Sequence, residues 1–583
     1  MEGNTNQWLP DRTMVQELKA HAAALGLCLL ILTGSLRLWR ADLGIPLAYS
    51  GDSLFTQLCI KGIIENGWYL HNNSVGAPGG SDLHDFPQVD NFHFLLLKAL
   101  SLVRAETAFV FNAYYLLTFP LVTLASLLVL RHFRLADAPS IVTSLLYTFL
   151  PYHFRRCSAG HLFLAAYFLI PLVVMIALWT CAAADRFSRR RLLYSIVICL
   201  VVSSAGVYYA FFACFLLLLA GLLSFVRHRT GRPLGRALVL VGIVFLGTLA
   251  NGSPTILYRL EHGANTEAVQ RLIEGPEIYG LKITQMLLPT GFHRLSFLAA
   301  KKAEYNASIP VGSGDLWYLG VVGAVGFLAL LVRLLAGGRS AAAAGVNEDN
   351  LDYLAGFNVF AVLLATVAGF GALFSFLVCP WIRCYERMSI YIAFFCLFAI
   401  TILLERLASR FGPGRWGRVF YLGLLSTILV VGIGDQVSRF LVPFYSYLKE
   451  QYASDAQFVA QIESALPQNA MIFQLPYMPF PESFPVVGVA DYDLLRGYLH
   501  SRTLRWSYGA MKGRAGDAWY KVAAKKPLEE LMPLLAATGF HGIYLDRFGF
   551  LDNGAEVEDK LTKLTGLKPL VSANQRLVFF KLD

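Results

Sequence analysis

The chain has 583 residues, of which 56% are hydrophobic and only 15% are charged, and its formal net charge is +10. Soluble globular proteins are roughly 45–50% apolar and about 25% charged, so this composition excludes an ordinary soluble domain and also a disordered, collagen-like or coiled-coil chain. A polytopic α-helical membrane protein fits. Its basic residues gather in cytoplasmic loops, so the positive charge is no sign of a nucleic-acid partner.

Apolar runs follow one another from residue 20 to residue 434, behind a short polar segment at 1–19. A span takes about 20 mostly apolar residues, and the runs predict a transmembrane region of about eleven helices. The predicted spans are 20–39, 107–130, 138–154, 161–184, 191–204, 207–226, 235–257, 316–336, 352–378, 388–405 and 417–434.

The pair 191–204 and 207–226 decides the topology. Only Ser203 to Gly206 separates the two runs, which suits a tight turn or a broken helix. If the N-terminus is cytoplasmic and the pair counts as two spans, the short arginine-rich loops all lie inside, as the positive-inside rule requires. A single span would move the later basic loops outside. Eleven spans therefore place residues 435–583 outside the cytoplasm.

Residues 435–583 carry charges throughout and contain no run of span length. Short apolar segments alternate there with amphipathic stretches, which predicts a soluble C-terminal α/β or α+β domain. The apolar segments are 470–475, 542–545 and 577–580, and the amphipathic stretches are 453–466, 525–537 and 555–564.

The first outside loop, 41–106, concentrates acidic and histidine side chains. Asp52 lies in a Gly-Asp-Ser turn just after the first span. A carboxylate at the membrane surface is partly desolvated, which raises its pKa and makes it a better base. Further along, Asp82, Asp85, Asp90 and His93 are candidates to bind a sugar or a metal ion, with Asp85 a second candidate for catalysis. The alternative is that a long loop must be polar somewhere.

Arg383 and Arg387 lie between two predicted spans on the outside, against the positive-inside trend. The planar guanidinium fork suits phosphate, and the i,i+4 spacing would put both side chains on one face if the segment is helical. The alternatives are an ion pair with Glu386 or contact with lipid headgroups. Arg155 and Arg156 form, with nearby histidines, a second outside basic cluster.

Tyr208 and Tyr209 follow the predicted helix break at 203–206. Irregular backbone at membrane depth is tolerated only inside the protein or beside a cavity, so these tyrosines are candidates to stack on a sugar. An interfacial aromatic belt would explain them equally well.

The acid after the first span, the outside arginines and the C-terminal domain together resemble bacterial GT-C membrane glycosyltransferases. This superfamily includes oligosaccharyltransferases, protein O-mannosyltransferases and lipid A aminoarabinose transferases. Its members take a sugar from a polyprenyl-phosphate carrier, and Asp52 matches the acid of their first outside loop. The group Asp82, Asp85 and Asp90 supplies candidates for a second acid. The tail lacks the Trp-Trp-Asp-like signature of the oligosaccharyltransferase branch.

The resemblance implies a multi-pass enzyme of the bacterial cytoplasmic membrane, active in glycan biosynthesis for the cell envelope. Such an enzyme transfers a sugar from a polyprenyl-phosphate donor to a glycan, lipid or protein acceptor on the outer face, in this case with Asp52 as general base and with inversion at the anomeric carbon of the sugar. The resemblance assigns no cofactor. A divalent cation, Mg²⁺ or Mn²⁺, is a candidate, with Asp82, Asp85 and Asp90 as candidate ligands.

Two other classes compete with this interpretation. A sugar transporter or lipid-carrier flippase typically places charges within its spans and shows internal repeats, and neither feature stands out here. A non-catalytic scaffold that presents the C-terminal domain to envelope partners would have no use for Asp52 as a base.

Overall fold

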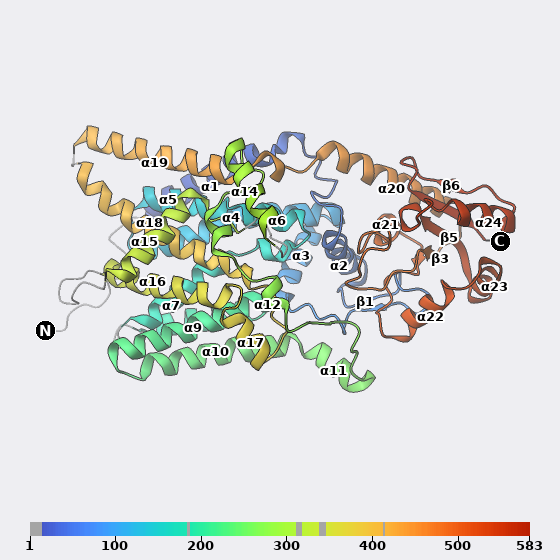
Figure 1. Cartoon of the computed structure of the whole chain (residues 1–583), viewed down its shortest axis with the longest axis horizontal. Helices are drawn as coiled ribbons and strands as arrows, with labels where there is room; N and C mark the ends of the chain where they lie inside the picture. The colour runs from blue at the N-terminus through green and yellow to red at the C-terminus, as the bar shows by residue number, and fades with distance from the viewer. Residues whose placement is uncertain (1–13, 183–186, 310–316, 337–345, 412–413, 583) are drawn as a thin grey trace.

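The computed structural model describes residues 14–182, 187–309, 317–336, 346–411 and 414–582. Most of the predicted cytoplasmic segment 1–19, the first residue of the predicted span 316–336 and the last two of 161–184 lie outside these ranges. The described part consists of a helical bundle and, beyond one end of it, a C-terminal domain (Figure 1).

Every one of the eleven predicted apolar runs contains a helix. The main bundle helices are α1 (Met14–Leu36), α4 (Thr107–His132), α5 (Asp137–Thr148), α7 (Leu169–Cys181), α8 (Arg189–Val202), α9 (Val207–His228), α10 (Arg232–Asn251), α15 (Gly320–Leu335), α16 (Val346–Ala365), α18 (Ser389–Ala408) and α19 (Arg415–Gln436). In the described part, six helical segments are long and apolar enough to cross a membrane: α1, α4, α9, α10, α19 and the continuous segment Tyr385–Phe411 that contains α18. The count of eleven spans stays a prediction.

Several predicted spans are interrupted because proline or glycine ends a helix within them. The run 138–154 divides into α5 and α6 (Pro151–Ser158), where Pro151 occupies the first turn of the second helix. The run 235–257 divides at Gly252 into α10 and α11 (Ser253–His262). The helix break predicted at 203–206 is confirmed, with α8 ending at Val202 and Gly206 at φ 106° before α9.

Short elements connect the bundle helices and turn the chain at their ends. They are η1 (Leu38–Arg40), η2 (Leu162–Ala165), α12 (Gly275–Ile278), α13 (Ile283–Leu287), α14 (Ser296–Ser308), α17 (Phe370–Leu377), η4 (Tyr385–Met388), η5 (Ser409–Phe411) and η6 (Arg439–Leu441). The cysteines at 379 and 384, which flank one of these turns, are both free thiols.

The first loop is folded rather than extended. It contains α2 (Asp52–Asn66), a two-stranded antiparallel pair of β1 (His71–Asn72) and β2 (Ser81–Asp82), and α3 (Asn91–Val103). Most of α2 is buried, as expected of a helix with bundle on one side and the C-terminal domain on the other.

The C-terminal domain contains both strands and helices. Its five-stranded mixed sheet has the order β4-β3-β5-β7-β6; β3 is parallel to β4 and β5, while β7 is antiparallel to β5 and β6. The strands are β3 (Met471–Leu475), β4 (Arg505–Trp506), β5 (Phe540–Asp546), β6 (Leu570–Val571) and β7 (Leu577–Lys581). The helices are α20 (Tyr445–Ala465), α21 (Leu495–His500), α22 (Ala515–Ala523), α23 (Leu528–Thr538) and α24 (Ala555–Thr565), with the short turn η7 (Arg547–Gly549).

Backbone hydrogen bonds join the first loop to this domain. The Gly76 N–H donates to the Tyr508 carbonyl and the Trp506 N–H donates to the Ser74 carbonyl, both at 2.9 Å. The buried ammonium group of Lys61, on α2, donates to the carbonyl of Tyr498 at 2.6 Å and also to that of Ser501. The loop and the domain therefore form a single layer over one end of the bundle.

Candidate active site

Asp52 is the first residue of α2, where the partial positive charge of a helix N-terminus favours a carboxylate. Its Oδ2 lies 2.8 Å from Nε2 of His161, and about half of its side chain is exposed. The turn after α6 comes very close. A Cβ built on Gly160, which has φ +77°, would lie 2.1 Å from the Ser53 nitrogen and 2.8 Å from the Asp52 Cβ. Only glycine fits there without displacing Asp52.

The neighbours of His161 determine which of its ring nitrogens carries the proton. Nη1 of Arg156 lies 3.0 Å from Nδ1 of His161, and a guanidinium can only donate. Nδ1 must therefore accept the hydrogen bond from Arg156. A neutral imidazole then carries its proton on Nε2, and this N–H donates a hydrogen bond to the Asp52 carboxylate. The guanidinium of Arg156 is buried over the rings of Tyr152 and Trp317, at 4.5 and 5.0 Å from their centroids. Arg156 thus orients His161, which in turn orients Asp52.

A cavity of roughly 250 Å³ opens beside Asp52, between the bundle and the layer above it. Five of the candidate residues from the sequence line it: Asp52, Asp90, Tyr208, Tyr209 and Arg387. They come from α2, from the loop before α3, from the start of α9 and from η4. The cavity therefore combines an acid, an arginine and aromatic rings, the groups that a phosphate-linked sugar requires.

The two outside arginines are placed differently. The Arg387 guanidinium lies in the cavity wall over the ring of Tyr208, 4.0 Å from its centroid. Arg383 precedes η4, so the two do not share a helical face and the i,i+4 argument fails. Arg383 lies 3.5 Å from Glu482, a residue of the C-terminal domain that itself lines the cavity. Arg383 is therefore not part of the cavity lining, but it contacts the lining residue Glu482.

Asp90 faces the same space. Burial raises the pKa of its carboxyl group to about 7, while the nearby charge of Arg387 opposes that rise. Its Oδ1 would lie 2.9 Å from a Cβ at Gly206, so the glycine of the helix break makes room for it.

Asp85 is engaged elsewhere. It is 1% exposed and receives hydrogen bonds from Arg514, at 2.6 and 3.0 Å, and from Asn265 at 3.0 Å. Burial alone would raise its pKa, but these hydrogen bonds outweigh burial and lower the pKa below its ordinary value. This arrangement favours a structural role for Asp85, joining the first loop to the C-terminal domain, over the catalytic role predicted from the sequence.

Three more candidates lie away from the cavity lining. Asp82 forms an ion pair with His84. His93 is buried, with Nδ1 2.7 Å from the Tyr114 hydroxyl and Nε2 3.3 Å from the Ala205 carbonyl oxygen. Arg155 is exposed and donates to Ser158 at 3.4 Å.

The described residues contain no group of three or more His, Cys, Asp or Glu side chains that could hold a metal ion. The aspartates at 82, 85 and 90, proposed from the sequence as metal ligands, therefore do not come together as one site. Asp82 forms an ion pair with His84, Asp85 accepts two hydrogen bonds from Arg514, and Asp90 lines the cavity.

Sequence reasoning missed two lining residues from the C-terminal domain, Glu482 and Tyr492. Glu482 accepts two hydrogen bonds from Arg271, at 2.7 and 3.0 Å. Four prolines between residues 476 and 485 restrict the backbone of the loop that holds Glu482, but nothing local in the sequence indicates which surface this loop faces.

Solved structures, and not sequence comparisons, show the fold of this chain. No protein-family model matches the chain, and no curated protein sequence matches it either. Among solved structures, ArnT from Cupriavidus metallidurans bound to undecaprenyl phosphate superposes with a TM-score of 0.54 at 11% identity, covering 98% of this chain and 99% of ArnT. The apo state of the same protein superposes with a TM-score of 0.54 at 11% identity, covering 97% of this chain and 98% of ArnT. The oligosaccharyltransferase of Archaeoglobus fulgidus is less similar, with a TM-score of 0.48 at 12% identity. The match covers 90% of this chain and 69% of the oligosaccharyltransferase. The chain therefore shares the fold of ArnT over 98% of its length.

Proposed function

We propose that this chain is a GT-C-like membrane glycosyltransferase that moves a sugar from a polyprenyl-phosphate donor to an acceptor hydroxyl on the outer face of a bacterial cytoplasmic membrane. One observation carries the proposal. An acid, Asp52, and an arginine, Arg387, line the same cavity where the apolar bundle meets the C-terminal domain. The fold shared with ArnT, whose structure holds undecaprenyl phosphate, supports a lipid phosphate as the donor's leaving group.

The chemistry follows from these charges. Asp52 accepts the proton of the acceptor hydroxyl, whose oxygen attacks the anomeric carbon of the sugar. The bond from that carbon to the phosphate oxygen breaks, and the lipid phosphate leaves with the electron pair. Arg387 stabilises the negative charge that develops on the phosphate. Attack from the face opposite the phosphate inverts the anomeric carbon.

Three side chains would support this reaction without touching the reacting atoms. His161 donates to the Asp52 carboxylate and so keeps one oxygen directed into the cavity, and Arg156 holds His161 in the required tautomer. Glu482 fixes Arg383 at the rim. Tyr208 and Tyr209 border the space left for the sugar.

The test is direct. Purified protein in lipid nanodiscs is incubated with a panel of radiolabelled polyprenyl-phosphate sugars and with envelope glycan, lipid and protein acceptors. We expect the label to pass from the lipid to one acceptor class with loss of the lipid-linked form. In a parallel assay with the protein in sealed lipid vesicles, label that crosses the membrane while it stays on its lipid would instead indicate the transporter or flippase class.

The close approach at Gly160 yields a prediction for this activity. Alanine at 160 would lie within 2.1–2.8 Å of atoms in Asp52 and Ser53, so the base must shift. Because a displacement of about 1 Å can lower a rate by about 10²-fold, Gly160→Ala should reduce transfer by that order and leave donor binding nearly unchanged. Transfer rate and donor affinity are measured side by side. Gly566→Ala is the matched control, since Gly566 also has a positive φ, +66°, but a Cβ there meets nothing within 4 Å. Equal transfer by both variants would contradict the placement of Asp52.

The topology proposed from the sequence yields a second prediction. An enzyme fused after Asp583 that is active only in the cytoplasm should be silent, because eleven spans after a cytoplasmic N-terminus place residues 435–583 outside. A periplasmic reporter at the same position should be active. The reverse pattern would show that the spans were miscounted.

A further inference from the structure

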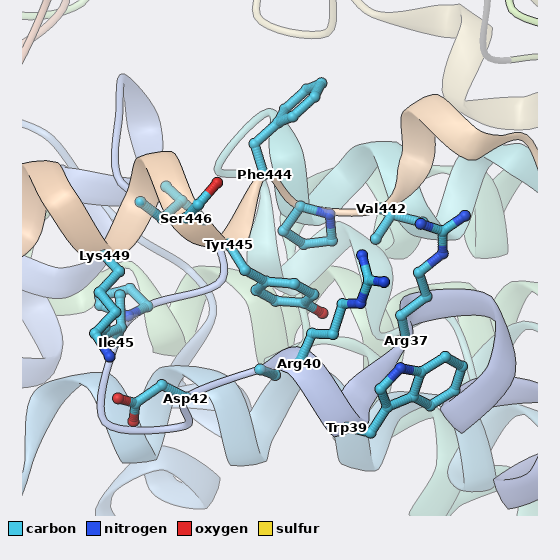
Figure 2. Close-up of a pocket in the computed structure, with 14 residues that line it drawn as sticks. Arg37, Trp39, Arg40, Asp42, Ile45, Val442, Phe444, Tyr445, Ser446 and Lys449 are labelled. Carbon is cyan, nitrogen blue, oxygen red and sulfur yellow. The ribbon is translucent and has the colours of Figure 1, made fainter.

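A second cavity, of about 520 Å³, lies where α1 leads into the first loop and α20 begins. Two chain segments line it, the turn from Arg37 to Pro46 and the segment from Val442 to Lys449 (Figure 2). It shares no lining residue with the cavity that contains Asp52.

The lining is cationic. The side chains of Arg37 and Arg40 extend from the same turn into the space toward Val442 and Tyr445, and Lys449 lies at the other end, near Asp42 (Figure 2). Asp42 is the single carboxylate in the lining, and its Oδ1 accepts a hydrogen bond from the Gly44 N–H at 3.0 Å. Within the described part of the chain, neither guanidinium forms an ion pair with a carboxylate. Two arginines directed into one cavity repel each other unless an anion lies between them, and their planar forks suit phosphate.

The backbone holds this arrangement in a fixed shape. Arg37 has φ 53°, in the left-handed region that non-glycine residues seldom adopt, and the turn η1 follows it. The hydroxyl group of Tyr445 donates to the Leu36 carbonyl at 2.7 Å and ties the start of α20 to the end of α1. The start of α20 has no side-chain cap, and its partial positive charge adds to that of the arginines.

The cavity also lies where lipid headgroups are expected. It adjoins the end of α1, a 23-residue helix that is apolar enough to span a bilayer. Trp39 and Phe444, which line its mouth, are 67% and 68% exposed. Exposed aromatic side chains at the end of a span are typical of the interface between membrane and water. A phosphate ester at this level is supplied by the adjacent lipid leaflet.

We propose that this cavity binds the phosphate of an anionic phospholipid headgroup, with Arg37 and Arg40 as its ligands and Lys449 near the remainder of the headgroup. The site is separate from the site of sugar transfer, and it does not depend on that activity.

The experiment uses the full chain in detergent and reads lipid retention by native mass spectrometry, titrated with phosphatidylglycerol, with phosphatidylcholine or with inorganic phosphate. We expect phosphatidylglycerol to be retained in preference to phosphatidylcholine. Its affinity should fall about tenfold or more in Arg37→Gln/Arg40→Gln, because charge-assisted contacts are lost. Arg40→Gln alone changes an exposed side chain, so it should fold normally and show a smaller loss.

The matched control is Lys521→Gln/Lys525→Gln, which removes the same charge from exposed positions of the C-terminal domain. It should retain phosphatidylglycerol like the parent. Equal affinity in the parent, the arginine variants and the control would overturn the site. Inorganic phosphate that displaces phosphatidylglycerol at equal concentration would overturn the lipid source and assign the cavity to free phosphate. Sugar transfer is measured separately, so its absence would leave this result unaffected.

Discussion

Sugar transfer by the Asp52→Asn protein should fall by about 10²–10⁴-fold, the usual contribution of a positioned general base. Asparagine has nearly the same size as aspartate and can still accept the hydrogen bond from His161, so folding and donor binding should stay close to normal. It cannot take a proton at neutral pH. The rate of transfer and the affinity for donor are measured on the same preparation in nanodiscs.

Two further variants sharpen this result. Asp52→Glu keeps the carboxylate and moves it by one methylene, so it should retain more activity than Asp52→Asn if the proton matters. Asp82→Asn is the matched control, because Asp82 belongs to the same loop but lies outside the cavity lining. Transfer at the parental rate by Asp52→Asn would refute its role as base and shift attention to Asp90, the other carboxylate of the first loop in the cavity wall.

The same variant separates the classes of function. If the protein is a transporter or flippase, Asp52→Asn should lower the flux of its substrate, and neither the parent nor the variant should transfer sugar. If it is a scaffold, the variant should behave like the parent in both assays. A selective loss of transfer with intact donor binding fits only an enzyme.

Replacing Arg387 should weaken donor binding more than replacing any other outside arginine. Its guanidinium lines the cavity, so Arg387→Ala removes a charge-assisted contact to the donor phosphate that is worth about 1.5–3 kcal/mol. Arg387→Lys should restore binding only in part, because an ammonium group lacks the bidentate fork and stacks less well on Tyr208. Undecaprenyl phosphate, which carries the phosphate without a sugar, is the probe, and its dissociation constant is the measurement.

Arg383 and Arg155 provide the comparison for Arg387. Arg383 lies near Glu482 outside the cavity lining, so Arg383→Ala should weaken binding less. Arg155 is exposed and also outside the lining, so Arg155→Ala should bind the probe like the parent. Unchanged binding in the Arg383→Ala/Arg387→Ala double variant would place the phosphate elsewhere, with Arg155 and Arg156 as the next candidates.

The sequence alone determined many of the helices and strands of this protein. Apolar runs predicted the bundle helices, Ser203 to Gly206 predicted the break before α9, and three short apolar segments of the tail predicted β3, β5 and β7. These features are local, because hydropathy and glycine act within a few residues of the chain. Local reasoning also selected Asp52 and Arg387, because a charged side chain close to a membrane is costly and often marks a functional site.

Only the tertiary structure decided which of these residues meet. It paired Asp52 with His161, and it used Asp85 to hold Arg514, 429 residues away. It also brought Glu482 from the C-terminal domain into the cavity wall. A carboxylate beside a histidine and a carboxylate beside an arginine look alike in a loop sequence. Their partners are set by packing between distant segments, and that packing makes one of them a candidate base and the other an anchor.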